Sequence, residues 1–404
     1  MPSSTATPHG DGDNNNTPRD AWYYPSEMRN DLRNTPLPAK WIDETLGCSW
    51  EFTRCAIVQV TPSNWDRYLA FARLMAIATV AEYKGDLVDL VPSSRHILGF
   101  DVEGLLATLF RGAPARIRND MTREYRTYLL LAGDKASDRR NSDLFRRYAN
   151  SLARSAKTWF RLRDGDGLGR FSIAAALACN GALDDDCFTE AQLQILGEIA
   201  CIQYDAVAYY KHRAEGEIHN TYAYVGSEAR KAAYHRSREV LWALDAAAAR
   251  DPKVLYAINY LRMIGGPIHI TMRRYRFVED GLALGKPETE QVVSDARKHV
   301  KLWNRVDMDV GLAADDRYAA VVARKDELLF PGLAEMLEQG EKGHCKDCLY
   351  PGVYGVQAAG QFGGVRLCDG CKAEWGDYMG SIFTRAVEAF PELRSFLAER
   401  EEAV

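Results

Sequence analysis

Three carboxylates that follow one apolar segment are the first residues of this chain whose spacing could support chemistry. Glu82, Asp86 and Asp89 come after residues 69–81, which are apolar on every helical face apart from Arg73. If the helix continues, these spacings place the three side chains on one face. Like charges four residues apart, and carboxylates near a helix C-terminus, each cost about 0.2–1 kcal/mol. Two interpretations stay open: a buried site compensated by Mg²⁺, or a helix end exposed to solvent.

A second group of polar side chains lies at the end of another expected helix, residues 189–217. Glu198, Asp205 and His212 recur every seven residues in this segment, so they would share a helical face. Charged residues of both signs surround the histidine, namely Lys211, Arg213, Glu215 and Glu217. A functional histidine and an ordinary core or surface histidine are both compatible with this pattern.

A basic cluster follows, in which Arg273, Arg274 and Arg276 flank Tyr275. A planar guanidinium and a phenol can together hold a phosphate group through directed hydrogen bonds. A basic run is more often only a solvated helix face. This cluster therefore supports a phosphate site only in combination with the two groups of polar side chains described above.

Four cysteines near the C-terminus have the spacing of a zinc site. Cys345 and Cys348 form one C-x2-C pair, Cys368 and Cys371 form another, and 19 residues separate the two pairs. This pattern is typical of tetrahedral, four-cysteine structural zinc. Four thiolates close the coordination shell, so the metal should fold a short β-ribbon and take no part in chemistry. The other five cysteines are expected to be reduced, since they lie in apolar or helical contexts.

The elements that must position these groups are helices. Expected helices span 64–90, 101–111, 119–131, 141–163, 167–180, 189–217, 228–249, 252–264, 267–284 and 287–305. No convincing alternating strands occur outside the cysteine-rich region, so the fold class is all-α. We expect an α-helical domain at 22–338 and a zinc ribbon at 339–404, whose final helix packs the ribbon onto the body. Asp134, Arg139 and Arg140 are expected to form ion pairs on a helix surface.

Composition excludes several classes of partner. The net charge of −5 argues against nucleic acid, and no apolar stretch reaches the roughly 18–20 residues of a membrane span. Residues 1–21 are polar and lack the apolar core of a secretory signal, so we expect a disordered tail and a cytoplasmic protein.

The order of the three polar groups resembles that of class I terpenoid synthases, which surround an apolar cavity with helices. Glu82-Tyr-Lys-Gly-Asp86 lies in register with their D-D-x-x-D motif. Residues 204–212 lie in register with N-D-x-x-S-x-x-x-E, although only Asp205 is kept. Arg274-Tyr275 stands where the late Arg-Tyr pair of that family would be, and Arg163 stands where a diphosphate-sensing arginine would be.

A more specific resemblance covers residues 21 to 395. The chain resembles the unusual fungal sesquiterpene synthases that make α-ionylideneethane for abscisic acid. Strings such as Cys48-Ser-Trp-Glu-Phe-Thr-Arg54 and His212-Arg-Ala-Glu-Gly-Glu217 carry it, with others at 21–25, 134–140, 144–148, 272–277, 302–307 and 361–364. The resemblance implies farnesyl diphosphate as the substrate and Mg²⁺ as the activator.

Such enzymes are thought to ionise farnesyl diphosphate, lose a proton to give a neutral acyclic polyene, regain a proton and close the ring. The resemblance therefore implies roles for the residues above. Glu82 and Asp86 would hold Mg²⁺, with Asp89 as a supporting catalytic carboxylate. His212, Glu215 and Asp205 would transfer protons or keep a metal contact. The diphosphate would be bound by Arg163, Lys211, Arg213, Arg274 and Tyr275.

Two alternatives stay open. One keeps the fold but releases an acyclic farnesene. The other is a non-enzymatic helical scaffold whose zinc ribbon binds another protein, for which the inward carboxylates would be dispensable.

Overall fold

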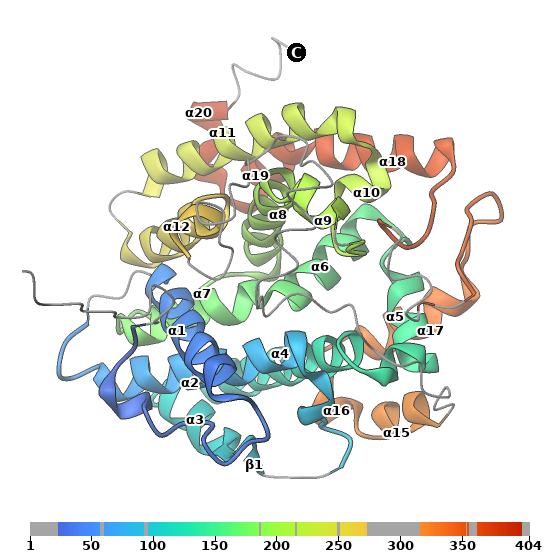
Figure 1. The fold of residues 1–404 in the computed structure, drawn as a ribbon. Helices are drawn as coiled ribbons and strands as arrows, with labels where there is room; N and C mark the ends of the chain where they lie inside the picture. Colours follow the sequence, from blue (N-terminus) through green and yellow to red (C-terminus); the bar gives the residue numbers. More distant parts are fainter. Residues whose placement is uncertain are drawn as a thin grey trace, which may run out of the picture.

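The computed structural model describes residues 23–56, 60–92, 96–185, 187–214, 216–248, 251–272, 316–352, 354 and 362–397. The described chain is built almost entirely of helices, which confirms the all-α expectation (Figure 1). In Figure 1, α1 to α4 form the lower part, α8, α11, α12, α18 and α19 the upper part, and α6 and α7 lie between them.

Helix α2 (Trp65–Tyr83) is the core of the lower part. Every residue from Tyr68 to Ala81 is buried except Arg73, which pairs with Asp31 at 2.8 Å. Its neighbours are α1 (Ala39–Cys55), α3 (Val102–Leu109), α4 (Ala115–Lys135) and α7 (Gly169–Cys179). A helix that is apolar on every face needs such complete coverage, so the expectation of a core helix is confirmed.

Helix α8 (Glu190–Val207) is the corresponding centre of the upper part. Its neighbours are α6 (Ala156–Gly167), α11 (Arg230–Ala248), α12 (Pro252–Ile264) and α19 (Ile382–Ala389). The shorter helices are η1 (Ser26–Met28), η2 (Gly85–Leu87), η3 (Asp138–Asn141), α5 (Asp143–Ser151), α9 (Tyr209–Ala214), α10 (Tyr222–Val225), η4 (Ser227–Ala229), α13 (Ile268–Thr271), α15 (Arg317–Ala323) and α16 (Lys325–Leu328).

Two expected helices in the middle of the chain are each broken into two. The segment expected at 141–163 divides into α5 and α6, because the Ser155 hydroxyl accepts the Thr158 N–H at 3.1 Å and starts a new helix. The segment expected at 189–217 ends as α8 at Val207 and resumes as α9, so its polar residues do not lie along one continuous helix.

The little β-structure is not confined to the cysteine-rich region. A two-stranded hairpin pairs β1 (His96–Ile97) with β2 (Phe100–Asp101), so the expectation of strands in the ribbon alone is wrong. The ribbon itself contributes an isolated bridge between Leu349 and Arg366.

The C-terminal helices pack onto the body. Helix α17 (Leu333–Lys342) lies against α5, and α18 (Asp369–Gly380) lies against α6 and α10. The single final helix expected at 372–400 is interrupted at Ser381 and Phe390, and continues as α19, η7 (Pro391–Leu393) and α20 (Arg394–Leu397). A domain boundary at 338 would fall inside α17, and the division stays a prediction.

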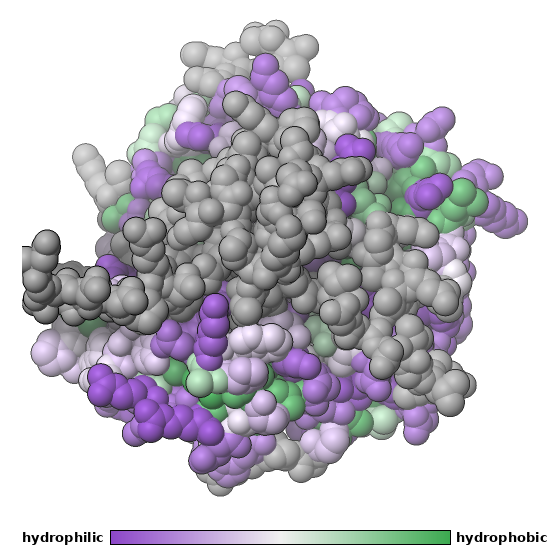
Figure 2. Space-filling model, viewed as in Figure 1, coloured by the Kyte–Doolittle hydropathy of each residue, from purple (hydrophilic) through white to green (hydrophobic). Residues whose placement is uncertain are grey.

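Hydrophilic and hydrophobic residues are interspersed on the described surface that Figure 2 shows. Among the described helices, none combines the length and the apolar character that crossing a membrane requires.

Candidate active site

The first predicted carboxylates lie at the C-terminal end of α2 but not on one helical face. Helix α2 stops short of η2 (Gly85–Leu87), which is a separate 3-10 turn. A side chain at the first residue of η2 would collide with the Gly133 carbonyl of α4, so close contact between two backbones accompanies the break. Glu82 is partly buried and accepts a hydrogen bond from the Tyr128 hydroxyl at 2.9 Å, whereas Asp86 is exposed. The expectation of one continuous carboxylate face is therefore wrong.

Asp89 belongs to an ion-pair network centred on Arg317. The guanidinium of Arg317 lies 3.0 Å from Asp89 and 2.6 Å from Asp134. Arg139 also binds Asp134, at 2.8 Å, and donates to two backbone carbonyls of residues 85–88. Asp134 is fully buried, so the expectation of helix-surface ion pairs is wrong here. The network fastens η2 and the start of α15 to α4.

Asp205, on the last turn of α8, is the anchor of the second predicted group. One carboxylate oxygen accepts from Arg163 at 2.9 Å, and the other accepts from the N–H and the hydroxyl of Thr221, at 2.8 and 2.9 Å. Arg163 also binds Asp166 at 3.0 Å, and its Nε has no hydrogen-bond partner within the described residues. Asp205 therefore joins α6, α8 and the segment after α9, while one N–H of Arg163 can still donate to a ligand.

His212, on α9, is buried, and Asn220 fixes its tautomer. The side-chain oxygen of Asn220 accepts the Tyr222 N–H at 3.0 Å, so its NH₂ group is the end that faces His212 Nδ1, also at 3.0 Å. Nδ1 is then an acceptor and the proton lies on Nε2. Burial, and next the charge of Lys211, lower the pKa of His212 well below its usual value. The ring is therefore neutral and can donate a hydrogen bond from Nε2.

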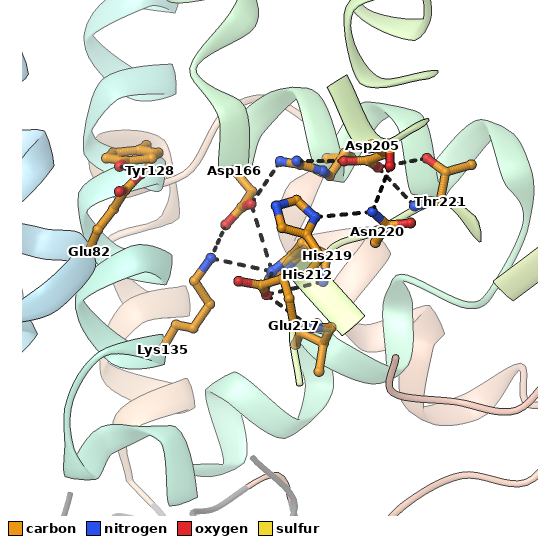
Figure 3. Close-up of polar contacts among 12 residues, drawn as sticks. Glu82, Tyr128, Lys135, Asp166, Asp205, His212, Glu217, His219, Asn220 and Thr221 are labelled. Carbon is orange, nitrogen blue, oxygen red and sulfur yellow. Dashed lines mark hydrogen bonds and ion pairs between the residues drawn. The ribbon is translucent and has the colours of Figure 1, made fainter. Parts of the chain in front are cut away.

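A buried cluster that the sequence did not predict lies beside these residues (Figure 3). His219 Nε2 lies 2.8 Å from the Tyr148 hydroxyl, and Nδ1 of the same ring lies 3.2 Å from Glu217 and 3.3 Å from Lys135. Lys135 also binds Asp166 at 2.8 Å. These side chains come from α4, α5, α6 and the segment after α9, so no helical periodicity could have linked them. The one sequence signal was the polar run that continues past Glu217.

The members of this cluster differ in charge and in access. Burial alone would raise the pKa of Asp166, but the charges of Lys135 and Arg163, and of His219 when its ring is protonated, outweigh it and the pKa lies below its usual value. Burial lowers the pKa of His219. The exposed side-chain fraction is 0% for Asp205, 6% for Asp166 and 16% for Glu217. Glu217 is thus the most accessible of these three carboxylates.

The remaining predicted residues are placed as follows. Lys211 is buried on α9 and Arg213 is exposed. Glu198 is buried and binds Arg385 of α19 at 2.8 Å, so it does not share the site with Asp205. The residues that lie outside the described chain are Glu215, Arg274 and Tyr275.

The four predicted zinc ligands converge. The sulfur atoms of Cys345, Cys348, Cys368 and Cys371 all lie within 4.8 Å of one another, and those of Cys345 and Cys368 are 3.9 Å apart. Tetrahedral zinc with Zn–S bonds of about 2.3 Å requires sulfur atoms about 3.8 Å apart, so the cluster fits zinc. Within the described residues, no other group of three or more metal-binding side chains is this close. Glu82, Asp86 and Asp89 in particular do not form one.

The ribbon reaches the buried cluster directly. The Gly363 N–H donates to the Glu217 carbonyl at 3.0 Å. Trp375 of α18 stacks on Tyr224 with ring centroids 5.4 Å apart. The segment that carries Glu217 and His219 is therefore held between the helical body and the cysteine ribbon.

Comparison with known proteins gives a consistent result. The family model described as "Alpha-ionylideneethane synthase aba3" matches residues 20–392. Alpha-ionylideneethane synthase aba3 of Botryotinia fuckeliana strain B05.10 is 51% identical over 378 residues, which is 93% of this chain and 84% of the relative. Alpha-ionylideneethane synthase abl3 is 48% identical in Leptosphaeria maculans (94% and 88% of the two chains) and 42% identical in Pyricularia oryzae strain Y34 (93% and 83%).

Proposed function

The chain belongs to the alpha-ionylideneethane synthase aba3 family, and from this membership we propose that it converts farnesyl diphosphate into α-ionylideneethane for abscisic acid. The observation that supports the proposal is the buried ionisable cluster near the C-terminal ends of α4, α6 and α8. Buried charges cost free energy even when they are paired, and a scaffold would gain nothing from them. We therefore favour a synthase over a zinc-ribbon scaffold.

We propose that Glu82 and Asp86 hold Mg²⁺. Proteins commonly bind Mg²⁺ through one or two carboxylates together with substrate phosphates, so a partly buried and an exposed carboxylate suit this ion. Bound there, Mg²⁺ would supply positive charge for the departing diphosphate. Asp89 would support Glu82 and Asp86 indirectly, because its ion pair with Arg317 helps to fix the position of η2.

We propose that cationic and hydrogen-bonding side chains hold the diphosphate beside the metal. The Nε–H of Arg163 and the Nε2–H of His212 are both donors in this region. The proposed diphosphate-binding residues are Arg163, Lys211, Arg213, Arg274 and Tyr275, with His212 as a further donor.

The proposed reaction needs one group that accepts a proton from the carbocation and a group that returns a proton to the neutral polyene. Such a group must reach the substrate and change its protonation state. Of the carboxylates Asp205, Asp166 and Glu217, Glu217 meets both needs best, since it is the most accessible of the three and contacts His219, which in turn contacts Lys135. Asp205 is then a positioning residue, and Glu215 stays a second proposed proton-transfer residue.

Incubation with farnesyl diphosphate and Mg²⁺, followed by gas chromatography–mass spectrometry, tests the function. We expect a cyclic C15 hydrocarbon identical to authentic α-ionylideneethane, which disappears when EDTA is added. Acyclic farnesenes as the sole products would contradict the cyclase and leave the lyase. Absence of any hydrocarbon would contradict both.

The Glu217→Gln variant tests the proton-transfer assignment. Because positioned acid–base groups contribute about 10²–10⁴ in rate, we expect cyclic product to fall at least a hundredfold. Diphosphate release should persist, with acyclic hydrocarbons or alcohols accumulating. The exposed residue Glu228 gives a matched control, as Glu228→Gln. Cyclic product from Glu217→Gln at the rate of this control would refute the assignment.

A further inference from the structure

A cavity lies at the opposite end of the helices from the buried cluster. Its volume is about 510 Å³, within the range of about 300–1,000 Å³ typical of small-molecule sites. The first halves of α4, α6 and α8 line it, whereas the last turns of the same helices carry Lys135, Asp166 and Asp205. Along α8, the 15 residues from Glu190 to Asp205 correspond to about 22 Å. The cavity is therefore a separate site.

A chain of buried ion pairs forms one wall of this cavity. Arg161 binds Glu124 through both terminal nitrogens, and its guanidinium lies 3.6 Å from the centre of the Phe330 ring. Arg170 binds Asp164 through Nε at 2.5 Å. Both arginines are at most 8% exposed, and burial raises the pKa of Glu124. Charges buried along a cavity wall are uncommon away from functional sites.

The two terminal nitrogens of Arg170 bind a carboxylate that a ligand could replace. NH1 and NH2 of Arg170 bind the two oxygens of Glu190, at 2.5 and 2.8 Å. The Glu190 side chain is 71% exposed, whereas that of Arg170 is 5% exposed. A planar guanidinium fork binds carboxylate and phosphate oxygens in the same two-pronged geometry, so an external anion can offer Arg170 the same hydrogen bonds as Glu190. Glu190 therefore occupies a position that an external anion could take.

Apolar side chains also line the cavity. They are Ile173, Leu177, Leu183, Phe188 and Leu193, and the remaining lining residues include the exposed cations Arg116 and Lys157 and the carboxylates of Asp120 and Asp185. We propose that this cavity binds an amphipathic anion, whose carboxylate or phosphate head displaces Glu190 from Arg170 and whose apolar chain lies against the leucine side chains. The site does not depend on the proposed synthase activity.

Isothermal titration calorimetry of the full chain with decanoate, decyl phosphate and decanol tests the proposal. We expect both anions to bind and decanol to bind at least tenfold more weakly; the stronger of the two anions identifies the preferred head group. Glu190→Gln removes the competing carboxylate, so it should tighten binding of the anions about two- to fivefold. Glu228→Gln, an equal change at an exposed residue outside the cavity, should leave affinity unchanged.

A second variant keeps the test independent of Glu190. Leu193→Trp fills the cavity from a partly exposed position, and it should abolish binding of both anions. Equal affinity for decanol and decanoate, binding that survives Leu193→Trp, or absence of anion binding to both the natural chain and Glu190→Gln would each overturn the proposal.

Discussion

Replacing Gly363 by alanine tests whether the cysteine ribbon positions the proposed proton-transfer segment. Gly363 has a positive φ of 81°, and its N–H donates to the Glu217 carbonyl. A Cβ added at this glycine would lie 3.0 Å from the Ala223 Cβ, on the same segment as Glu217. The substitution therefore strains the contact between ribbon and segment without touching a metal ligand or an ionisable group.

The size of the effect follows from the backbone angle and the contact. An alanine in the left-handed region costs roughly 1–2 kcal/mol, and the close Cβ contact requires a shift of a few tenths of an ångström. We therefore expect the free energy of unfolding to fall by about 1–2 kcal/mol. Because a displacement of about 1 Å at reacting groups can cost a hundredfold in rate, a smaller shift of Glu217 should lower the rate of cyclic product formation about tenfold.

Gly352→Ala is the matched control. Gly352 belongs to the same ribbon, but its φ is not positive, and a Cβ there meets no atom of the described residues within 4 Å. The assays are denaturant unfolding, zinc content, and product formation measured by gas chromatography–mass spectrometry. Zinc content should be equal in both variants. If Gly363→Ala matched Gly352→Ala in both stability and product rate, the ribbon would have no positioning role.

Two further perturbations have defined outcomes. Chelation of zinc from the four-cysteine cluster should lower the thermal unfolding temperature and remove cyclic product, and both should return when zinc is added back; an unchanged unfolding temperature would contradict a structural metal. Acid should also destabilise the protein, because burial, and next the charge of Lys211, lower the pKa of His269 from 6.5 to about 3. Below about pH 6.5 the unfolded chain binds this proton and the folded chain does not. The free energy of unfolding therefore keeps its full contribution from His269 above that pH and falls by about 2 kcal/mol near pH 5. Denaturant midpoints should show the slope, and His269→Asn should reduce it; an equal slope in the variant would contradict the assignment.

The parts of the structure that local patterns encode were predictable. Helix α2 was identified as a core helix because apolar residues occupy every face, and the structure buries it on all sides. The cysteines were identified because two C-x2-C pairs are the usual sequence pattern of four-cysteine zinc sites, and the four sulfur atoms converge. In both cases neighbours in sequence determine the geometry.

Features that depend on contacts between distant segments were not predictable. The face shared by Glu82, Asp86 and Asp89 assumed that α2 continues, but Gly85 packs against the α4 backbone and the helix ends. Similarly, Glu198 and Asp205 lie seven residues apart on α8, but they do not belong to the same site, since Glu198 binds Arg385 of α19. Periodicity describes one helix and contains no information about the partner that a side chain meets.

The same limit explains why the sequence pointed to His212, Glu215 and Asp205 for proton transfer and not to Glu217, which we propose for that role. His212 stood out because of its neighbours in the chain, yet its accepting nitrogen is occupied by Asn220 and its pKa is lowered by burial. To act as a base it would have to break that hydrogen bond and become a buried cation. Asp205 and Asp166 each hold a cation, and protonating either would weaken a buried ion pair, a loss that costs several kcal/mol. Glu217 is the more accessible carboxylate, beside a neutral histidine whose other nitrogen contacts a tyrosine hydroxyl, so a proton that arrives there can pass on by hydrogen bonds without breaking either ion pair.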